Sequence, residues 1–151
     1  MKKYSSPDST IHVLARALIV QGNSVLICKH KEHYFLPGGH VENGESLLVA
    51  LRREFMEELG EFKYSNPEQI GVCENIFIEK NDSTQHEINH IFITEVDSKV
   101  QFESKESFLS FEQIKITDLE RVDILPKHLK PVLIKWFEDR KPFFVGMDIL
   151  E

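Results

Sequence analysis

The chain has 151 residues, of which 41% are hydrophobic, 10% aromatic and 28% charged, and its formal net charge is −7. This length is close to the usual size of one domain, and the composition excludes a mostly disordered chain, a collagen-like chain and a disulfide scaffold. The negative charge argues against a protein that coats DNA or RNA, although cations can still join an acidic protein to a polyanion.

Cysteine content and the N-terminal sequence indicate the compartment. Cys28 and Cys73 are far apart in the sequence and are expected to be small buried side chains in a reducing environment. Residues 1–9 are polar and predict a flexible N-terminus that lacks the apolar stretch of a signal peptide. No apolar run approaches the ~18 residues that a membrane span needs, so we expect a cytoplasmic protein without a membrane partner.

Hydrophobic patterns and turn-forming residues predict the secondary structure. In chain order, strands are expected over 11–20, 25–28, 70–79, 87–96 and 108–114, and helices over 46–59 and 126–138. Ser46 is a suitable N-cap for the first helix, and Gly60 stands where that helix should end. Pro37-Gly38-Gly39 predicts a loop before it, and Pro126 suits the first turn of the second helix.

The order of these elements predicts the fold class. No repeat, low-complexity tract or linker interrupts the chain, so residues 10–151 are expected to form one domain. Strands precede and follow the first helix, and a second helix comes after them, which predicts a mixed α/β or α+β sandwich. The apolar segment 142–147 is expected either to fold back on the core or to cover a second copy in a homodimer.

The first predicted helix carries three carboxylates in an unusual position. On a helix of about 100° per residue, Glu54, Glu57 and Glu58 share an arc of about 100° that overlaps the edge of the apolar stripe. An acidic surface normally lies opposite the core stripe, and like charges at i, i+4 repel each other. Such a cluster suits a hard divalent cation, whereas the alternative is an ordinary solvated helix rich in glutamate.

The segment before this helix favours a metal site. Gly38 and Gly39 allow the backbone to approach a ligand closely and to present its carbonyls and amides. Glu45 stands just before the helix, from where it could reach towards the first turn. A glycine loop, a single glutamate and a helix with paired glutamates form a combination that chance rarely assembles.

These residues resemble the Nudix box. That motif has a glycine, a glutamate, then Arg-Glu, an apolar residue, any residue, Glu-Glu, any residue, glycine and an apolar residue. Gly39, Glu45 and the run Arg53-Glu54-Phe55-Met56-Glu57-Glu58-Leu59-Gly60 match it, and only Glu61, at the final apolar position, departs from it. From about residue 10 the flanking sequence is also similar to the family, with Arg16 on a strand, paired long strands and a C-terminal helix.

The resemblance implies a Nudix α/β/α sandwich, with a mixed β-sheet between helices, that hydrolyses a nucleoside diphosphate linked to another moiety. One to three cations, Mg²⁺ or alternatively Mn²⁺, would bind Glu54, Glu57, Glu58 and a carbonyl of Gly38 or Gly39. By the same resemblance, Arg53 would orient a glutamate of the box through an ion pair, and Glu45 would shape the loop or assist the metals.

The implied reaction needs a general base. Cations would neutralise the diphosphate and lower the pKa of the attacking water, and a carboxylate would then remove its proton. Glu54 is the first candidate. Glu103 and Glu106, in a polar loop after the paired strands, are the second, because some relatives take the base from a downstream loop. Otherwise both are solvated loop acids.

Basic and aromatic residues outside the box are candidates for substrate contacts. Arg16 interrupts an apolar strand, where it either reaches a phosphate or places its charged end in water. Lys29 lies in a basic segment and either contacts the outer phosphates or is solvated. Phe77 and Phe92 either stack on a nucleobase or pack in the core.

The substrate stays open among nucleoside triphosphates, dinucleoside polyphosphates and nucleotide sugars. A second hypothesis is a non-catalytic nucleotide-binding regulator on the same fold, although such proteins usually lack box glutamates and none is missing here. A third is an isomerase of isoprenoid diphosphates. It would need a catalytic cysteine, and neither Cys28 nor Cys73 lies in a motif that supports this role.

Overall fold

The computed structural model describes residues 10–147, so the flexible segment expected at residues 1–9 lies outside the described part. The strands are β1 (Thr10–Gln21), β2 (Ser24–His30), β3 (His33–Phe35), β4 (Gly38–His40), β5 (Glu68–Ile78), β6 (Thr84–Glu95), β7 (Ser110–Lys115) and β8 (Phe143–Val145). The helices are α1 (Leu47–Leu59), the short 3₁₀ helix η1 (Ile116–Arg121) and α2 (Leu129–Asp139).

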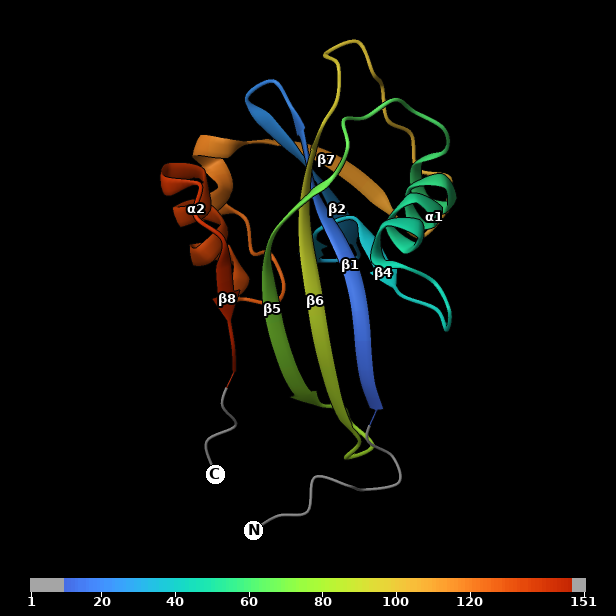
Figure 1. Cartoon of the computed structure of the whole chain (residues 1–151), viewed down its shortest axis with the longest axis vertical. Coiled ribbons are helices and arrows are strands. Elements are labelled where there is room, and N and C mark those ends of the chain that lie inside the picture. Colours follow the sequence, from blue (N-terminus) through green and yellow to red (C-terminus); the bar gives the residue numbers. More distant parts are fainter. Residues whose placement is uncertain (1–9, 148–151) are drawn as a thin grey trace.

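All eight strands belong to one mixed sheet (Figure 1). Its strand order is β3-β2-β1-β6-β5-β8, while β4 pairs with β1 and β7 pairs with β2. At the centre, β1 runs parallel to β6 from Thr10 opposite Gln85 to Val20 opposite Glu95, and β5 pairs antiparallel with β6. The two α-helices lie on opposite sides of this sheet, which confirms the predicted mixed α+β sandwich (Figure 1).

Alternation along the central strands creates a core on each face. Leu18 and Ile91 pack in the cluster that contains residues of α2, whereas Ala17 and Phe92 pack in the cluster that contains residues of α1. Phe92 is only 4% exposed, so it is a core residue. The same alternation places Arg16 on the α2 side of β1, next to Leu18 along the strand.

Helix α1 forms where the sequence predicts it. Ser46 accepts a hydrogen bond at Oγ from the backbone N–H of Val49 (3.3 Å), and the N–H of Gly60 donates to the carbonyl of Met56. Gly60 has φ +80°, which suits glycine at a helix C-terminus. Leu51 and Phe55 are buried against the sheet, so the predicted apolar stripe faces the core.

Two predictions of local structure are wrong. Gly38-Gly39 belongs to a strand, because β4 pairs antiparallel with β1. Gly38 has φ +128°, and a Cβ there would collide with the backbone of Ala15, so glycine is needed for close pairing as well as for turning. Helix α2 begins at Leu129 and not at Pro126, whose carbonyl accepts the N–H of Leu129 in a turn.

The segment after α2 folds back onto the sheet, which is the first of its two predicted arrangements. Strand β8 pairs parallel with β5, with Gly71 opposite Phe143. A Cβ on Gly71 would lie 2.5 Å from the Phe143 ring, so only a residue without a side chain leaves room for this ring. No helix among the described residues is long and apolar enough to cross a membrane.

Candidate active site

Arg53 joins the carboxylates that surround the start and middle of α1. Its Nε donates to Oε1 of Glu45 (2.7 Å), and its Nη2 donates to Oε2 of the same carboxylate (3.0 Å). Its Nη1 reaches Oε1 of Glu54 (3.0 Å) and Oε2 of Glu57 (3.4 Å), and its Nη2 also donates to the carbonyl of His40 (2.9 Å). The planar fork of arginine can make all these bonds at once, so one side chain fixes three carboxylates and the end of β4.

Glu45 closes the loop between β4 and α1. Its Oε2 accepts a hydrogen bond from the backbone N–H of Glu42 (3.0 Å) as well as from Arg53. These donors stabilise the ionised form, Arg53 most strongly, and lower the pKa of Glu45 to about 2. Glu45 therefore stabilises its own loop and fixes the guanidinium of Arg53. It does not cap the helix, because Ser46 does.

Glu58 is the buried member of the carboxylate group. Its residue is 6% exposed, and its Oε2 has no hydrogen-bond partner within the described residues. Burial, followed by the charge of Glu54, raises the pKa of Glu58 to about 8, against the opposing effects of Arg16 and of a backbone hydrogen bond from Gly38. An ionised carboxylate at this position is unfavourable unless a cation compensates it.

The glycines of β4 allow the helix carboxylates to lie against the strand. A Cβ on Gly39 would stand 2.6 Å from Oε1 and from the carboxyl carbon of Glu54. Such a distance is shorter than van der Waals contact permits, so the carboxylate of Glu54 occupies the space that a side chain would need. The acidic side of α1, formed by Glu54, Glu57 and Glu58, therefore lies against β4, and we call it the carboxylate surface.

The carboxylate surface offers oxygen ligands, which hard cations prefer. No group of three His, Cys, Asp or Glu side chains within residues 10–147 converges closely enough to hold a metal ion unaided. Two of the helix carboxylates, Glu54 and Glu57, are instead bound by Arg53. The unpartnered oxygen of Glu58 and the carboxylate of Glu54 beside Gly39 still form a donor set made of oxygen, which Mg²⁺ and Mn²⁺ prefer.

Arg16 lies between the carboxylates and a pocket on the α2 side of the sheet. Its Nη1 donates to the carbonyl of Leu36 (2.9 Å) and lies 3.5 Å from that of Gly38, while its Nε donates to Oδ1 of Asn89 (3.3 Å). No carboxylate among the described residues forms an ion pair with it. Arg16 is thus held by neutral acceptors, and its charge is available to an anionic ligand.

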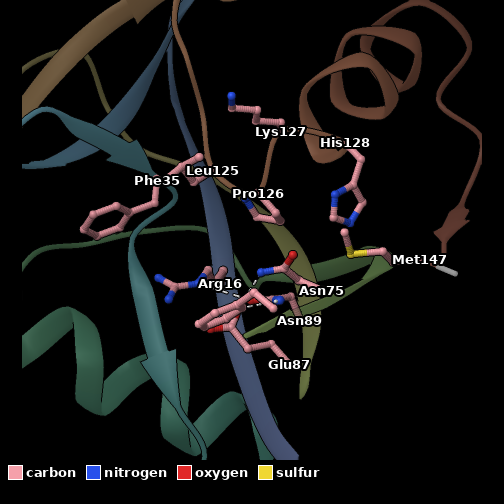
Figure 2. A pocket seen from close by; sticks show the side chains of 11 residues that line it. Arg16, Phe35, Asn75, Glu87, Asn89, Leu125, Pro126, Lys127, His128 and Met147 are labelled. Carbon is pink, nitrogen blue, oxygen red and sulfur yellow. Dashed lines mark hydrogen bonds between the residues drawn. The ribbon is translucent and has the colours of Figure 1, made fainter. Parts of the chain in front are cut away.

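The pocket next to Arg16 has a volume of about 480 Å³ (Figure 2). Apolar side chains, among them Phe35 and Phe77, line it together with Arg16, Asn75 and Glu87. A mostly apolar cleft with a few polar groups is typical of small-molecule sites. The carboxylate surface and this pocket meet at Arg16, which is influenced by the charges of both Glu58 and Glu87.

Comparison with known proteins identifies the family. The family model for the NUDIX domain matches residues 10–139, which is most of the chain. The chain belongs to the Nudix hydrolase family.

Solved structures share its fold. A MutT protein from Bacillus halodurans is 17% identical, with 89% of this chain and 88% of that one covered at a TM-score of 0.67. A MutT protein from Methanosarcina mazei Go1 is 19% identical, with 90% and 99% covered and a TM-score of 0.67. The NUDIX domain of Shewanella oneidensis NrtR, complexed with ADP ribose, is 17% identical, with 87% and 88% covered and a TM-score of 0.66.

Lys29 is not brought to the Nudix site. Its Nζ lies 3.6 Å from Oε1 of Glu112 and 5.1 Å from the centre of the Tyr34 ring, and it is not among the residues that line the pocket. Strand β2 pairs with β7 at this point, so the cross-strand acid satisfies the lysine.

The downstream loop of the Nudix domain approaches the carboxylates through Glu106. The backbone N–H of Lys105 donates to the carbonyl of Glu58 (2.8 Å), which attaches the loop to the end of α1. Glu106 is half-buried, and its charge contributes to the raised pKa of Glu58, whereas Glu103 is exposed. Of the two loop acids, only Glu106 therefore acts electrostatically on the buried carboxylate.

Sequence reasoning missed five polar residues of the pocket: Asn75, Glu87, Asn89, Lys127 and His128. Asn75 lies on β5, Glu87 and Asn89 lie on β6, and Glu87 stands directly opposite Asn75 in the pairing of these two strands. Polar residues are the majority on β6, so the polar character of Glu87 and Asn89 did not mark them as site residues. Without the register of the two strands, nothing indicated that they meet beside Arg16.

Proposed function

We propose that this Nudix domain hydrolyses a diphosphate bond in a nucleoside diphosphate linked to another moiety, with Mg²⁺ or Mn²⁺ as cofactor. The observation that carries the proposal is the buried carboxylate of Glu58 near Glu54 and β4, whose Oε2 has no hydrogen-bond partner among residues 10–147. A carboxylate that is costly to ionise without a cation, placed beside a pocket whose arginine has no ion-pair partner among the described residues, suits binding of a metal-bound diphosphate.

The chain offers oxygen ligands and groups that hold them. Glu54, Glu57, Glu58 and the carbonyl of Gly38 would bind the cation. When bound, the cation neutralises the diphosphate and lowers the pKa of the attacking water. Arg53 keeps Glu54 and Glu57 in place through its ion pairs, with Glu45 fixing the guanidinium on its other edge.

Arg16 and a carboxylate would act on the substrate directly. Arg16 would bind a phosphate oxygen, because its guanidinium has no acidic partner among the described residues and borders the pocket. Glu54 is our first candidate for the base that takes the proton of the water. Glu106 is the second, because it is half-buried and acts on Glu58, and Glu103 is disfavoured by its exposure.

The proposed substrate class follows from the pocket and the fold. Phe35 and Phe77 offer apolar surface to a nucleoside beside the phosphate-binding Arg16. Nucleoside triphosphates, dinucleoside polyphosphates and nucleotide sugars all meet this requirement. The same proposal takes residues 10–151 as one domain, supported by the single continuous sheet, and places it in the cytoplasm.

The buried cysteines give no support to an isomerase. Cys28 and Cys73 are both buried, and burial raises the pKa of each thiol to about 12. A catalytic cysteine needs an accessible thiolate, which neither position offers.

A nucleotide-binding regulator is the alternative function. The likeness to the NrtR NUDIX domain with ADP ribose supports it at the level of the fold. The complete set of box glutamates favours catalysis, since binding alone does not require a buried carboxylate such as Glu58, whose Oε2 has no hydrogen-bond partner among the described residues.

The two functions are separated by a substrate panel assayed with Mg²⁺ and with a chelator. We expect release of a nucleoside monophosphate that stops on chelation, and a loss of at least about 100-fold in kcat/KM for Glu58→Gln. Turnover that survives both changes would contradict the metal-dependent mechanism. Tight nucleotide binding without turnover in Mg²⁺ or Mn²⁺ would favour the regulator.

A further inference from the structure

Four polar side chains form a connected network on the α2 face of the central strands (Figure 2). Glu87 and Asn89 are two residues apart on β6, so they share a face, and Asn75 on β5 lies directly opposite Glu87. Arg16 on β1 completes the group through Asn89. All four line the pocket described above.

The hydrogen-bond chemistry fixes how these side chains are oriented. Arginine only donates, so the bond from Nε of Arg16 requires the carbonyl oxygen of Asn89 on that side. A carboxylate accepts, so Nδ2 of Asn89 (3.5 Å) and Nδ2 of Asn75 (3.4 Å) both face Oε2 of Glu87. The donors of both amides are therefore directed to the same carboxylate oxygen.

Two acceptors remain for a ligand. Within residues 10–147, Oε1 of Glu87 and Oδ1 of Asn75 make no hydrogen bond to the protein. Both atoms belong to residues that line the pocket, and the two residues are cross-strand neighbours. Because Asn75 and Glu87 are hydrogen-bonded to each other, the second oxygen of each side chain is close to the other residue, and such a pair complements a ligand edge with two adjacent donors.

We infer that Glu87 determines base specificity and that, together with Asn75, it selects a guanine nucleotide. Among the common bases, guanine alone carries two adjacent donors on one edge, N1–H and the N2 amino group. Adenine, cytosine and uracil each place an acceptor next to their donor on the corresponding edge. This inference rests on the proposed function for its substrate class, and it names the base that the same site reads.

Hydroxyl groups are the other source of paired donors in a nucleotide. The 2′ and 3′ hydroxyls of ribose could meet the same two acceptors. The base is favoured, because Phe77 lines the same pocket and offers flat apolar surface on the strand that carries Asn75. The two sources are distinguished by removing one donor at a time from the ligand.

The test measures binding without turnover. Titration calorimetry in Mg²⁺ compares GMP with IMP, which lacks only the N2 amino group, and with dGMP, which lacks only the 2′ hydroxyl. Wild-type protein should bind GMP about 10- to 100-fold more tightly than IMP, the usual range for a paired carboxylate contact, and dGMP about as tightly as GMP. Glu87→Gln should reduce the preference for GMP over IMP to less than about threefold, because its amide replaces one acceptor by a donor.

Glu95→Gln is the matched control, since Glu95 is an exposed acid on the same strand outside the pocket. It should keep the wild-type preference. Equal affinity of the wild type for GMP and IMP would overturn the inference, and so would an unchanged preference in Glu87→Gln. A loss of affinity for dGMP alone would assign the acceptors to ribose and also overturn it. The comparison of GMP with IMP on the wild type needs no variant, so it decides the matter even if Glu87→Gln does not fold.

Failure of the proposed function gives a different result. If the protein binds GMP selectively but hydrolyses no nucleotide, the base-reading role of Glu87 stands and hydrolysis is wrong. If it hydrolyses GTP and ITP with equal kcat/KM, hydrolysis stands and the inference is wrong.

Discussion

Replacing Glu58 by Gln should make the metal-free protein more stable at neutral pH. The pKa of Glu58 is about 8 in the folded chain, above the ordinary value of 4.5, because the carboxylate is buried near Glu54. Between these two values the folded state holds a proton that the unfolded state has released, so stability falls as the pH rises through this window. Below pH 4.5 both states are protonated, and this cost vanishes.

The raised pKa of Glu58 determines how much stability the substitution should add. At pH 7 the cost is about 3 kcal/mol, since the pH lies 2.5 units above the ordinary pKa and each unit is worth about 1.4 kcal/mol. Glutamine is neutral at every pH and avoids the cost. For a chain of this length, Glu58→Gln should raise the melting temperature by about 6–12 °C at pH 7 in a chelator, and by little at pH 4.

Thermal unfolding followed by circular dichroism, with and without Mg²⁺, measures this directly. Mg²⁺ should stabilise the wild type more than Glu58→Gln, because only the wild type has the buried carboxylate for it. Glu57→Gln is the matched control on the same helix, and its half-exposed side chain should change stability by less than about 1 kcal/mol. A Glu58→Gln protein that is no more stable than the wild type at pH 7, or whose gain is the same at pH 4, would refute the reasoning.

Three further predictions concern the glycine strand, the arginine and the thiols. Gly39→Ala places a Cβ 2.6 Å from the Glu54 carboxylate, so kcat/KM in a hydrolysis assay should fall at least about 10-fold; unchanged activity would show that this contact does not matter. Arg53→Lys keeps the charge but loses the fork that holds three carboxylates, so kcat should fall about 10- to 100-fold, and full activity would refute a positioning role. Cys28 and Cys73 should react with a thiol reagent only after unfolding, which absorbance detects, and rapid native labelling would contradict their burial.

Structural features that depend only on residues close together in the sequence could be predicted from short sequence patterns. Helix α1 could be predicted because the cap at Ser46, the apolar stripe and the stop at Gly60 are all read within fifteen residues. The alignment of Glu58 with the edge of the stripe also indicated its burial, which the structure shows. These features depend on the period of one helix and not on the rest of the fold.

Features that depend on distant partners could not be predicted. The strand at Gly38 exists because β1 pairs with it, although its local sequence favours a turn. The neutralisation of Lys29 by Glu112 and the meeting of Asn75 with Glu87 both require strand registers that no short segment encodes. The candidate site residues on the sheet were therefore missed more often than those on the helix.

Hydrolysis by Glu58→Gln under conditions where it is demonstrably folded tests the central claim most directly. The claim is that the buried carboxylate is retained at the expense of stability because it binds the cation that hydrolysis needs. We predict a variant that melts at a higher temperature in chelator than the wild type, yet releases nucleoside monophosphate from nucleotide substrates at least about 100-fold more slowly in Mg²⁺. A variant that is as active as the wild type would contradict the account.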